Sequence, residues 1–270
     1  MRAVSGRLLL VGAGKMGGAM LDRWLASGLD PARTAVFDPF LDESRGSALL
    51  GQGVTIHRTA PHDTFDLLIV AVKPQSMAET LKSVAPLTAP DALVVSVAAG
   101  VRLATLAEAF GAGTALVRVM PNTPAQIGKG MSVAVAAGPL DPGRRSAVEA
   151  LLDAVGESAW VEDEALIDAV TAVSGSGPAY VFLLAECLAT AAIEAGLPPD
   201  LAARLARQTV IGGGALLEAS PDSAAKLREN VTSPNGTTAA ALAVLMAPDG
   251  LAALLAKAVE AARKRSVELG

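Results

Sequence analysis

The pattern of apolar and polar positions changes character about halfway along the chain. In the first half, short apolar runs alternate with segments whose apolar residues recur at helical spacing. From about residue 163 onward the strand-like runs stop, and helical spacing continues to the end. We therefore predict an α/β domain over residues 1–162 and a helical domain over 163–270.

The apolar runs of the first half have the length and the flanking turn residues of buried β-strands. They span 7–11, 34–38, 66–72, 92–97 and 115–119, with weaker candidates at 131–137 and 157–162. Helical segments at 16–27, 75–85 and 141–154 lie between them. Because strand–helix–strand units cross over with one hand and pair in parallel, this order predicts a doubly wound Rossmann sheet.

The second half is expected to be almost continuously helical, with helices at 164–173, 177–195, 199–218, 236–246 and 249–268. Several of these helices are apolar nearly all round, which is unusual for a surface helix. We expect this surface to be buried in a homodimer or a larger assembly such as a decamer. The alternative is a thick helical layer folded back on the chain's own sheet. The SGSGPAY segment (174–180) predicts a kinked junction near the cleft.

Composition narrows the possible partners. Of the 270 residues, 51% are hydrophobic and 3% aromatic, and the net charge is −5. No basic surface for nucleic acid or an anionic membrane is expected, so the partner is a small molecule. The single cysteine, Cys187, fits a reducing cytosol and is expected to be a buried structural thiol. Charged residues, Gly and Pro interrupt the apolar runs, and no signal peptide is evident, so a cytoplasmic protein is expected.

A glycine motif, GAGKMG, follows the first strand and opens a helix, which is the context of the dinucleotide fingerprint. Gly12 makes the tight turn, Gly14 admits the pyrophosphate to the backbone, and Gly17 lets the helix pack on the strand. The predicted cofactor residues of this motif are Gly12, Ala13, Gly14, Lys15, Met16 and Gly17. The cofactor is NADPH or NADH.

Asp38 ends the second predicted strand, where an acidic side chain binds the adenosine ribose hydroxyls and repels a 2′-phosphate. This position favours NADH modestly over NADPH, although Arg33 or Arg45 could still bind the 2′-phosphate of NADPH. The alternative is that Asp38 caps a helix starting near residue 41.

Three further segments lie at the ends of predicted strands, at the edge of the sheet where ligands bind. They contribute Val72, Lys73 and Pro74 from AVKP, Ala98 and Ala99 from SVAAGV, and Asn122 from MPNTP. Each segment alone has a composition that ordinary loops also have, but their occurrence at successive strand ends predicts a cofactor site.

The segment VTSPNGTT (231–238) precedes an apolar helix. Ser233 or Thr232 is the expected N-cap, and the free N–H groups of such a helix start bind an anion. Thr237 and Thr238 would place two hydroxyls beside it. Glu164 precedes another apolar helix and could orient a substrate or cap that helix. No metal site is expected.

Taken together, GAGKMG, AVKP, SVAAGV, MPNTP, SGSGPAY and RENVTSPNGTT resemble, in order, the pyrroline-5-carboxylate reductase family along essentially the whole chain. The last two blocks are the specific ones. The resemblance implies an N-terminal Rossmann domain, a helical domain that interlocks in a dimer, and reduction of L-1-pyrroline-5-carboxylate to L-proline by NAD(P)H, the last step of proline biosynthesis.

The resemblance also assigns the substrate loop to Ser233–Thr238, with Asn230 just before it. The backbone N–H groups of this loop, which includes Gly236 and Thr237, would hold the substrate carboxylate, and Thr238 would hydrogen-bond the ring nitrogen. Glu164 falls at a position that lies near the substrate in some members. Where the family usually has Gly, this chain has Asn235, a residue that tolerates positive φ. The rival interpretations are a reductase of another imino or 2-keto acid, and a nucleotide-binding regulator without turnover.

Overall fold

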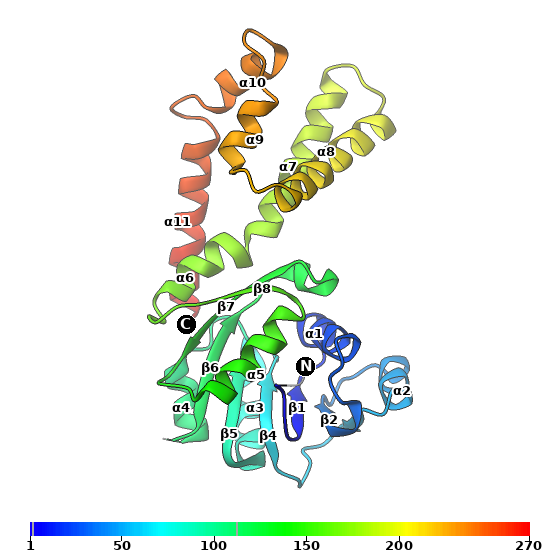
Figure 1. Ribbon diagram of the computed structural model, residues 1–270, viewed down its shortest axis with the longest axis vertical. Coiled ribbons are helices and arrows are strands. Elements are labelled where there is room, and N and C mark those ends of the chain that lie inside the picture. The colour runs from blue at the N-terminus through cyan, green and yellow to red at the C-terminus, as the bar shows by residue number, and fades with distance from the viewer. Residues whose placement is uncertain (2, 112) are drawn as a thin grey trace. The chain divides into compact units, whose positions relative to one another are not determined.

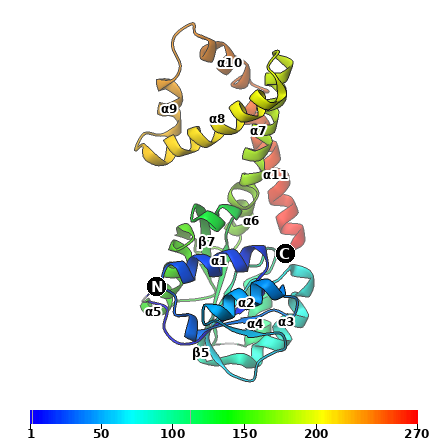
Figure 2. The same ribbon diagram turned by 90° about the vertical axis from the view of Figure 1, so that its right-hand side faces the viewer.

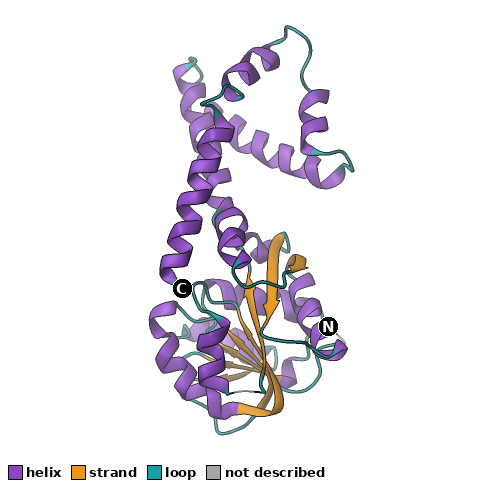
Figure 3. Cartoon of the chain, turned by 90° about the vertical axis from the view of Figure 1, so that its left-hand side faces the viewer, coloured by secondary structure: helices purple, strands orange, loops and turns teal. Residues whose placement is uncertain are grey.

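The computed structural model describes residues 1, 3–111 and 113–270. The chain divides into two compact units, one formed by Met1–Gly175 with Arg263–Gly270 and the other by Ser176–Ala262. Every strand of the described residues lies in the first unit, and the second contains helices and loops alone (Figure 3).

The first unit is built on a single eight-stranded sheet with the order β3-β2-β1-β4-β5-β6-β7-β8 (Figure 1). Its strands are β1 (Leu8–Val11), β2 (Thr34–Phe37), β3 (Thr55–His57), β4 (Phe65–Val70), β5 (Thr88–Ser96), β6 (Ala115–Met120), β7 (Gly130–Ala136) and β8 (Gly156–Trp160). All neighbours pair in parallel except β6 and β7, which are antiparallel. The predicted Rossmann sheet is confirmed, and β3 is a strand that the apolar pattern did not predict.

Helices cover both faces of this sheet, which is why its central strands are continuously apolar. One hydrophobic core joins the sheet to α1 (Lys15–Ala26), α2 (Glu43–Gly51) and α5 (Pro142–Asp153). The other core lies under α3 (Met77–Val84), α4 (Leu103–Phe110) and α6 (Leu166–Val170). Trp24 on α1 also donates its indole N–H to the carbonyl of Leu151 on α5 at 2.8 Å, which fixes these two helices side by side.

The strand order reverses at β1, whose neighbours are β2 on one side and β4 on the other. Crossovers from these two strands leave in opposite directions, and this opens a crevice at their carboxyl ends. The glycine motif follows β1, and the AVKP segment follows β4. The topology therefore brings two segments that are distant in the sequence to one crevice.

The second unit contains α7 (Gly177–Glu194), α8 (Pro199–Ala219), α9 (Ala224–Asn230), α10 (Thr237–Leu245) and most of α11 (Leu251–Leu269), with α7 packed against α8 (Figure 2). Only Ala202 and Ala206 are buried among its residues, all of which are described. Cys187 is exposed on α7, so the expectation of a buried thiol is wrong for this chain by itself. Nothing in the chain covers α7 well enough to bury its side chains.

One continuous helical stretch, Leu166–Glu194, is long and apolar enough by length and composition to cross a membrane. The interruptions expected from the sequence do not break it, because a π-helical turn at Thr171–Gly175 joins α6 to α7. The unit boundary falls directly after this turn. The chain returns to the first unit at Arg263, where Ser266 donates a 2.6 Å hydrogen bond to Asp168 of α6.

Candidate active site

The glycine motif forms a tight turn between β1 and α1. Gly12 has φ of +89°, which an L side chain rarely adopts, and its N–H donates to the carbonyl of Phe37 on β2. Gly14 is the N-cap of α1, and it makes no side-chain capping bond. The start of α1 therefore presents backbone N–H groups without a side-chain partner, in the arrangement that binds phosphate.

The space above this turn is open where a ligand has to approach. A Cβ built on Gly14 would meet no atom within 4 Å, whereas a Cβ on Gly17 would collide with the carbonyl oxygen of Gly12. Gly14 thus leaves room for a pyrophosphate, and Gly17 lets α1 pack against β1, as the fingerprint predicts.

Asp38 links the end of β2 to the glycine turn. Its Oδ2 accepts a hydrogen bond from the N–H of Ala13 at 2.9 Å, and its Oδ1 accepts one from the N–H of Phe40 at 2.9 Å. The helix that follows is capped by Asp42, whose side chain accepts from the N–H of Arg45. The alternative role of Asp38 as the cap of that helix is therefore excluded.

The side chain of Asp42 also accepts a hydrogen bond from the hydroxyl of Ser44 at 2.7 Å. This bond and those from the backbone hold the pKa of Asp42 below its usual value, because they stabilise the ionised carboxylate. The negative charge of this cap interacts favourably with the positive end of the α2 dipole, at the start of the helix.

A cavity of about 450 Å³ extends from the glycine turn across the carboxyl ends of β1, β2 and β4. It is lined by Val11, Gly12, Gly14, Phe37, Asp38, Pro39, Phe40, Ala71, Val72, Lys73, Ser76 and Thr80. Five predicted cofactor residues, Gly12, Gly14, Asp38, Val72 and Lys73, thus share one cavity. Phe40, Ser76 and Thr80 belong to it as well, and no motif in the sequence marks them.

A second, more open cavity of about 640 Å³ lies beside the start of α1. Ala13, Gly14 and Lys15 line it together with Arg45, which forms an ion pair with Asp22. Asp22 also lines this cavity and balances the charge of Arg45, so Lys15 supplies the net positive charge next to the uncapped helix start, where a phosphate binds.

The remaining predicted cofactor residues, Met16, Gly17, Pro74, Ala98, Ala99 and Asn122, line neither cavity. Ala98 is buried, and the side chain of Asn122 serves the fold instead. Its Oδ1 accepts from the N–H of Met131, and its Nδ2 donates to the carbonyl and hydroxyl oxygens of Ser174. Asn122 therefore ties the loop after β6 to β7 and to the π-helical turn.

The predicted substrate loop lies in the second unit and leads into α10. Gly236, not Ser233 or Thr232, is the N-cap of α10, so the sequence-based assignment of the cap is wrong. The hydroxyl of Thr232 instead donates to the carbonyl of Arg228 at 2.6 Å. Gly236 makes no side-chain capping bond, so α10 also begins with N–H groups that no side chain caps.

The turn before α10 depends on two residues. Asn235 has φ of +60°, the left-handed conformation expected for a residue that replaces glycine there. A Cβ on Gly236 would meet the hydroxyl oxygen of Ser233 and would lie 3.1 Å from the Ser233 carbonyl oxygen, so a larger residue at the cap would require this turn to adjust. Asn230, at the end of α9, donates to Asp222 at 3.5 Å.

Glu164 lies in the first unit and is engaged in a structural ion pair. Its Oε1 accepts from Arg118 Nη1 at 2.7 Å and from the N–H of Leu103 at 2.9 Å, at the first residue of α4. The Arg118 side chain is only 6% exposed, so Glu164 neutralises a nearly buried charge and caps a helix other than the one it precedes. The substrate role of Glu164 stays a prediction.

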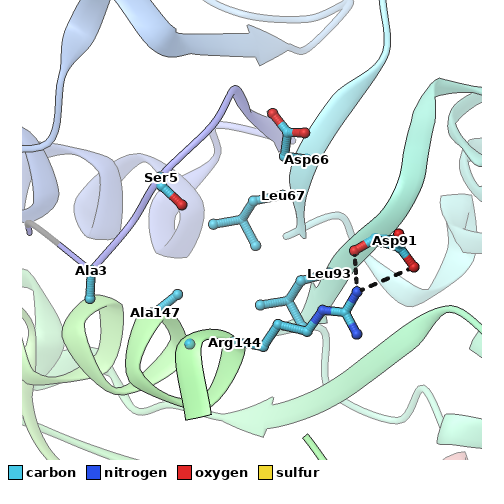
Figure 4. A pocket seen from close by; sticks show the side chains of 9 residues that line it. Ala3, Ser5, Asp66, Leu67, Asp91, Leu93, Arg144 and Ala147 are labelled. Atoms are coloured by element: carbon cyan, nitrogen blue, oxygen red, sulfur yellow. Dashed lines mark hydrogen bonds and ion pairs between the residues drawn. The ribbon is translucent and has the colours of Figure 1, made fainter. Parts of the chain in front are cut away.

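A third cavity, of about 210 Å³, lies near the amino ends of β1 and β4 (Figure 4). Arg144 projects along one wall and donates to the backbone carbonyl of Asp91 at 2.5 Å. This end of the sheet is opposite to the crevice where parallel sheets bind ligands, and no predicted site residue lines the cavity.

Two family models match the chain. One, described as pyrroline-5-carboxylate reductase dimerisation, matches residues 164–269. The other, described as NADP oxidoreductase coenzyme F420-dependent, matches residues 7–100 and so includes the glycine turn and Asp38.

Whole-chain comparisons point the same way. A pyrroline-5-carboxylate reductase of Pseudomonas aeruginosa is 39% identical, over 97% of this chain and 96% of that protein. The solved pyrroline-5-carboxylate reductase of Coxiella burnetii is 32% identical, with a TM-score of 0.91 and 99% of each chain covered. That of Plasmodium falciparum, solved with NADP bound, is 26% identical, with a TM-score of 0.82 and 98% of each chain covered. From its glycine turn, its α10 start and these relatives, the chain belongs to the pyrroline-5-carboxylate reductase family.

Proposed function

We propose that this chain reduces L-1-pyrroline-5-carboxylate to L-proline by hydride transfer from NAD(P)H, the last step of proline biosynthesis. The observation that carries the proposal is that α1 and α10 each begin at a glycine N-cap, Gly14 and Gly236, which makes no side-chain capping bond, inside a chain of this family. One start suits the pyrophosphate of a dinucleotide, and the other suits a small carboxylate. Residues 1–162 serve the cofactor, and residues 163–270 serve the substrate and dimerisation.

The residues around the glycine turn fit the cofactor. The unobstructed approach to Gly14 and the uncapped start of α1 form a cradle for the pyrophosphate, with Ala13, Lys15, Met16 and Gly17 in the same turn. Val72 and Lys73 line the same cavity as Gly12 and Gly14, Pro74 follows them, and Ala98, Ala99 and Asn122 lie on the loops that follow β5 and β6. When bound, NAD(P)H supplies the hydride.

Asp38 sets the preference between the two cofactors. Two backbone N–H groups hold its carboxylate in place, so it cannot turn away from an incoming ribose without losing both bonds. A fixed carboxylate accepts the ribose hydroxyls of NADH and repels the 2′-phosphate of NADPH. We therefore propose a modest preference for NADH over NADPH.

The start of α10 receives the substrate. The backbone N–H groups of the Ser233–Thr238 loop hold its carboxylate, with Asn230 just before the loop. Glu164 is a further candidate for substrate binding. The hydroxyl of Thr238 hydrogen-bonds the ring nitrogen. Because a protonated cyclic imine accepts hydride directly, the protein has mainly to position the two reactants and exclude water.

A homodimer in the cytoplasm completes the proposal. In the second unit only Ala202 and Ala206 are buried, and residues such as Phe182 on α7 and Val244 on α10 are largely exposed. A helical layer this poor in buried residues needs a partner surface, and a second copy provides one.

The test is to incubate the purified chain with L-1-pyrroline-5-carboxylate and either NADH or NADPH, following both cofactor oxidation and proline. We expect proline to form in proportion to cofactor oxidised, with a higher kcat/KM for NADH. Asp38→Ser should shift this ratio toward NADPH. Cofactor oxidation without proline, or no oxidation with either cofactor, would overturn the proposed reaction.

A further inference from the structure

Phe40 is the most exposed large hydrophobic side chain among the described residues, at 94%. It is nevertheless held in a defined turn, because its N–H donates to Asp38 Oδ1 at 2.9 Å. The next residue, Leu41, points the other way and is buried in the core. The turn therefore fixes the backbone of Phe40 and places its aromatic ring outside the core.

The surroundings of Phe40 belong to the cavity that starts at the glycine turn. Pro39 and Phe40 line it after β2, whereas Val72, Ser76 and Thr80 line it after β4 and on α3. Gly12 and Gly14 line the same cavity. Asp38 connects them to Phe40, because its carboxylate accepts hydrogen bonds from the N–H of Ala13, between the two glycines, and from the N–H of Phe40. The cavity thus runs from a phosphate site, past a carboxylate, to an aromatic ring.

This order matches the order of groups in one half of a dinucleotide. The pyrophosphate binds at the helix start, and the adenosine ribose binds the acidic residue that ends β2. The group attached beyond that ribose is the adenine, a flat base with two π-faces. A base in this position meets Phe40, only two residues beyond the carboxylate.

We propose that Phe40 is the adenine platform of this enzyme, stacking on one face of the base. The inference rests on the proposed function only as far as the chain binds a dinucleotide, and it adds a specificity-determining residue that no motif marks. Stacking of an aromatic side chain on a base is worth enough to change affinity by about tenfold or more.

The experiment compares wild type, Phe40→Ala and Phe40→Trp with three ligands. Calorimetry measures Kd for ADP-ribose, which carries adenine but no nicotinamide. Steady-state kinetics measure KM for NADH and for reduced nicotinamide mononucleotide, which lacks adenine. Leu50→Ala is the matched control, because Leu50 is another exposed apolar residue of the first unit that lines no cavity named above.

We expect Phe40→Ala to weaken the binding of ADP-ribose and to raise the KM for NADH about tenfold, while the KM for the mononucleotide is unchanged. Phe40→Trp should restore both, and Leu50→Ala should behave as wild type. An unchanged Kd for ADP-ribose in Phe40→Ala, or an equal rise in KM for NADH and for the mononucleotide, would overturn the proposed stacking role of Phe40.

The two proposals fail in different ways. If wild type binds ADP-ribose and Phe40→Ala weakens it, but no proline forms, the platform stands and the proposed reaction fails. If proline forms and Phe40→Ala binds ADP-ribose as wild type does, the reaction stands and the platform fails. If wild type binds neither ADP-ribose nor NADH, both are overturned.

Discussion

At the scale of single residues, the chemistry of this chain depends on a few side chains whose partners lie far away in the sequence. Asp38 holds the N–H of Ala13, 25 residues before it, and Glu164 pairs with Arg118, 46 residues before it. Thr238, by contrast, depends on its own neighbourhood, because it is the second residue of α10 and lies two positions after the Gly236 cap.

Thr238 can be tested at this scale. Thr238→Ala should lower kcat by about a hundredfold, because a positioned group that shares a proton with the reacting nitrogen contributes about that much. The KM for NADH should not change. Thr238→Ser keeps the hydroxyl and should recover most of the rate, and wild-type kcat in Thr238→Ala would remove the residue from the mechanism.

Glu164→Gln separates a structural role from a substrate role. Loss of the charge leaves Arg118 nearly buried without its counter-ion, so we expect unfolding in urea to require about 2 kcal/mol less free energy. This value is below that of a fully buried pair because the Glu164 side chain is 27% exposed. Glu162→Gln, at an exposed position nearby, is the control. Unchanged stability with a raised KM for the imine would instead place Glu164 at the substrate.

At the scale of elements, the turn between β1 and α1 shows how two glycines of one motif do different work. Gly14 faces open space, whereas Gly17 faces the carbonyl oxygen of Gly12 and the side chain of Ala71. A methyl group added at Gly14 would occupy space that the ligand needs. A methyl group added at Gly17 would overlap atoms of the protein itself.

The pair Gly14→Ala and Gly17→Ala therefore has opposite expected outcomes. Gly14→Ala should fold with nearly unchanged stability, since Gly14 has φ of −67°, and should raise Kd for NADH about tenfold. Gly17→Ala should lower the free energy of unfolding by about 1–3 kcal/mol through overpacking. Thermal melts with and without NADH distinguish them, and equal behaviour of the two variants would contradict these roles.

At the scale of the whole molecule, the two units differ in how they are stabilised. The first has two hydrophobic cores, one on each face of the sheet. In the second, only Ala202 and Ala206 are buried, and the Cβ positions of Gly212, Gly213 and Gly214 on α8 meet nothing within 4 Å. Surface of this kind allows another helix to approach closely, so assembly and folding of the second unit should be coupled.

Phe182→Glu tests this coupling, since Phe182 is 68% exposed on the apolar surface of α7. A charge there should dissociate the assembly, because it would be buried without a partner in the interface. Sedimentation should show a smaller species, and the melting temperature should fall. Leu50→Glu, on α2 of the first unit, should leave both unchanged, and an intact oligomer in Phe182→Glu would contradict the predicted interface.

Much of the fold follows from patterns among neighbouring residues. The apolar runs predict seven of the strands, because strands buried on both faces must be continuously apolar. The pattern misses β3, whose sequence Thr55-Ile56-His57 is short and only partly apolar. The predicted helices also do not include α4 or α9, and the α9 sequence AAKLREN is largely polar. The glycine motif and the turn at Asn235 were predictable because φ preferences are local.

Other features were decided by tertiary structure alone. The cap of α2 by Asp42, the pairing of Glu164 with Arg118 and the bond from Ser266 to Asp168, 98 residues apart, follow from how the elements pack. So does the position of Phe40 at the end of a cavity that begins in another strand's turn. The physical reason is that periodicity and turn preference act between adjacent residues, whereas ion pairs, caps and cavities depend on which distant segments the sheet order brings together.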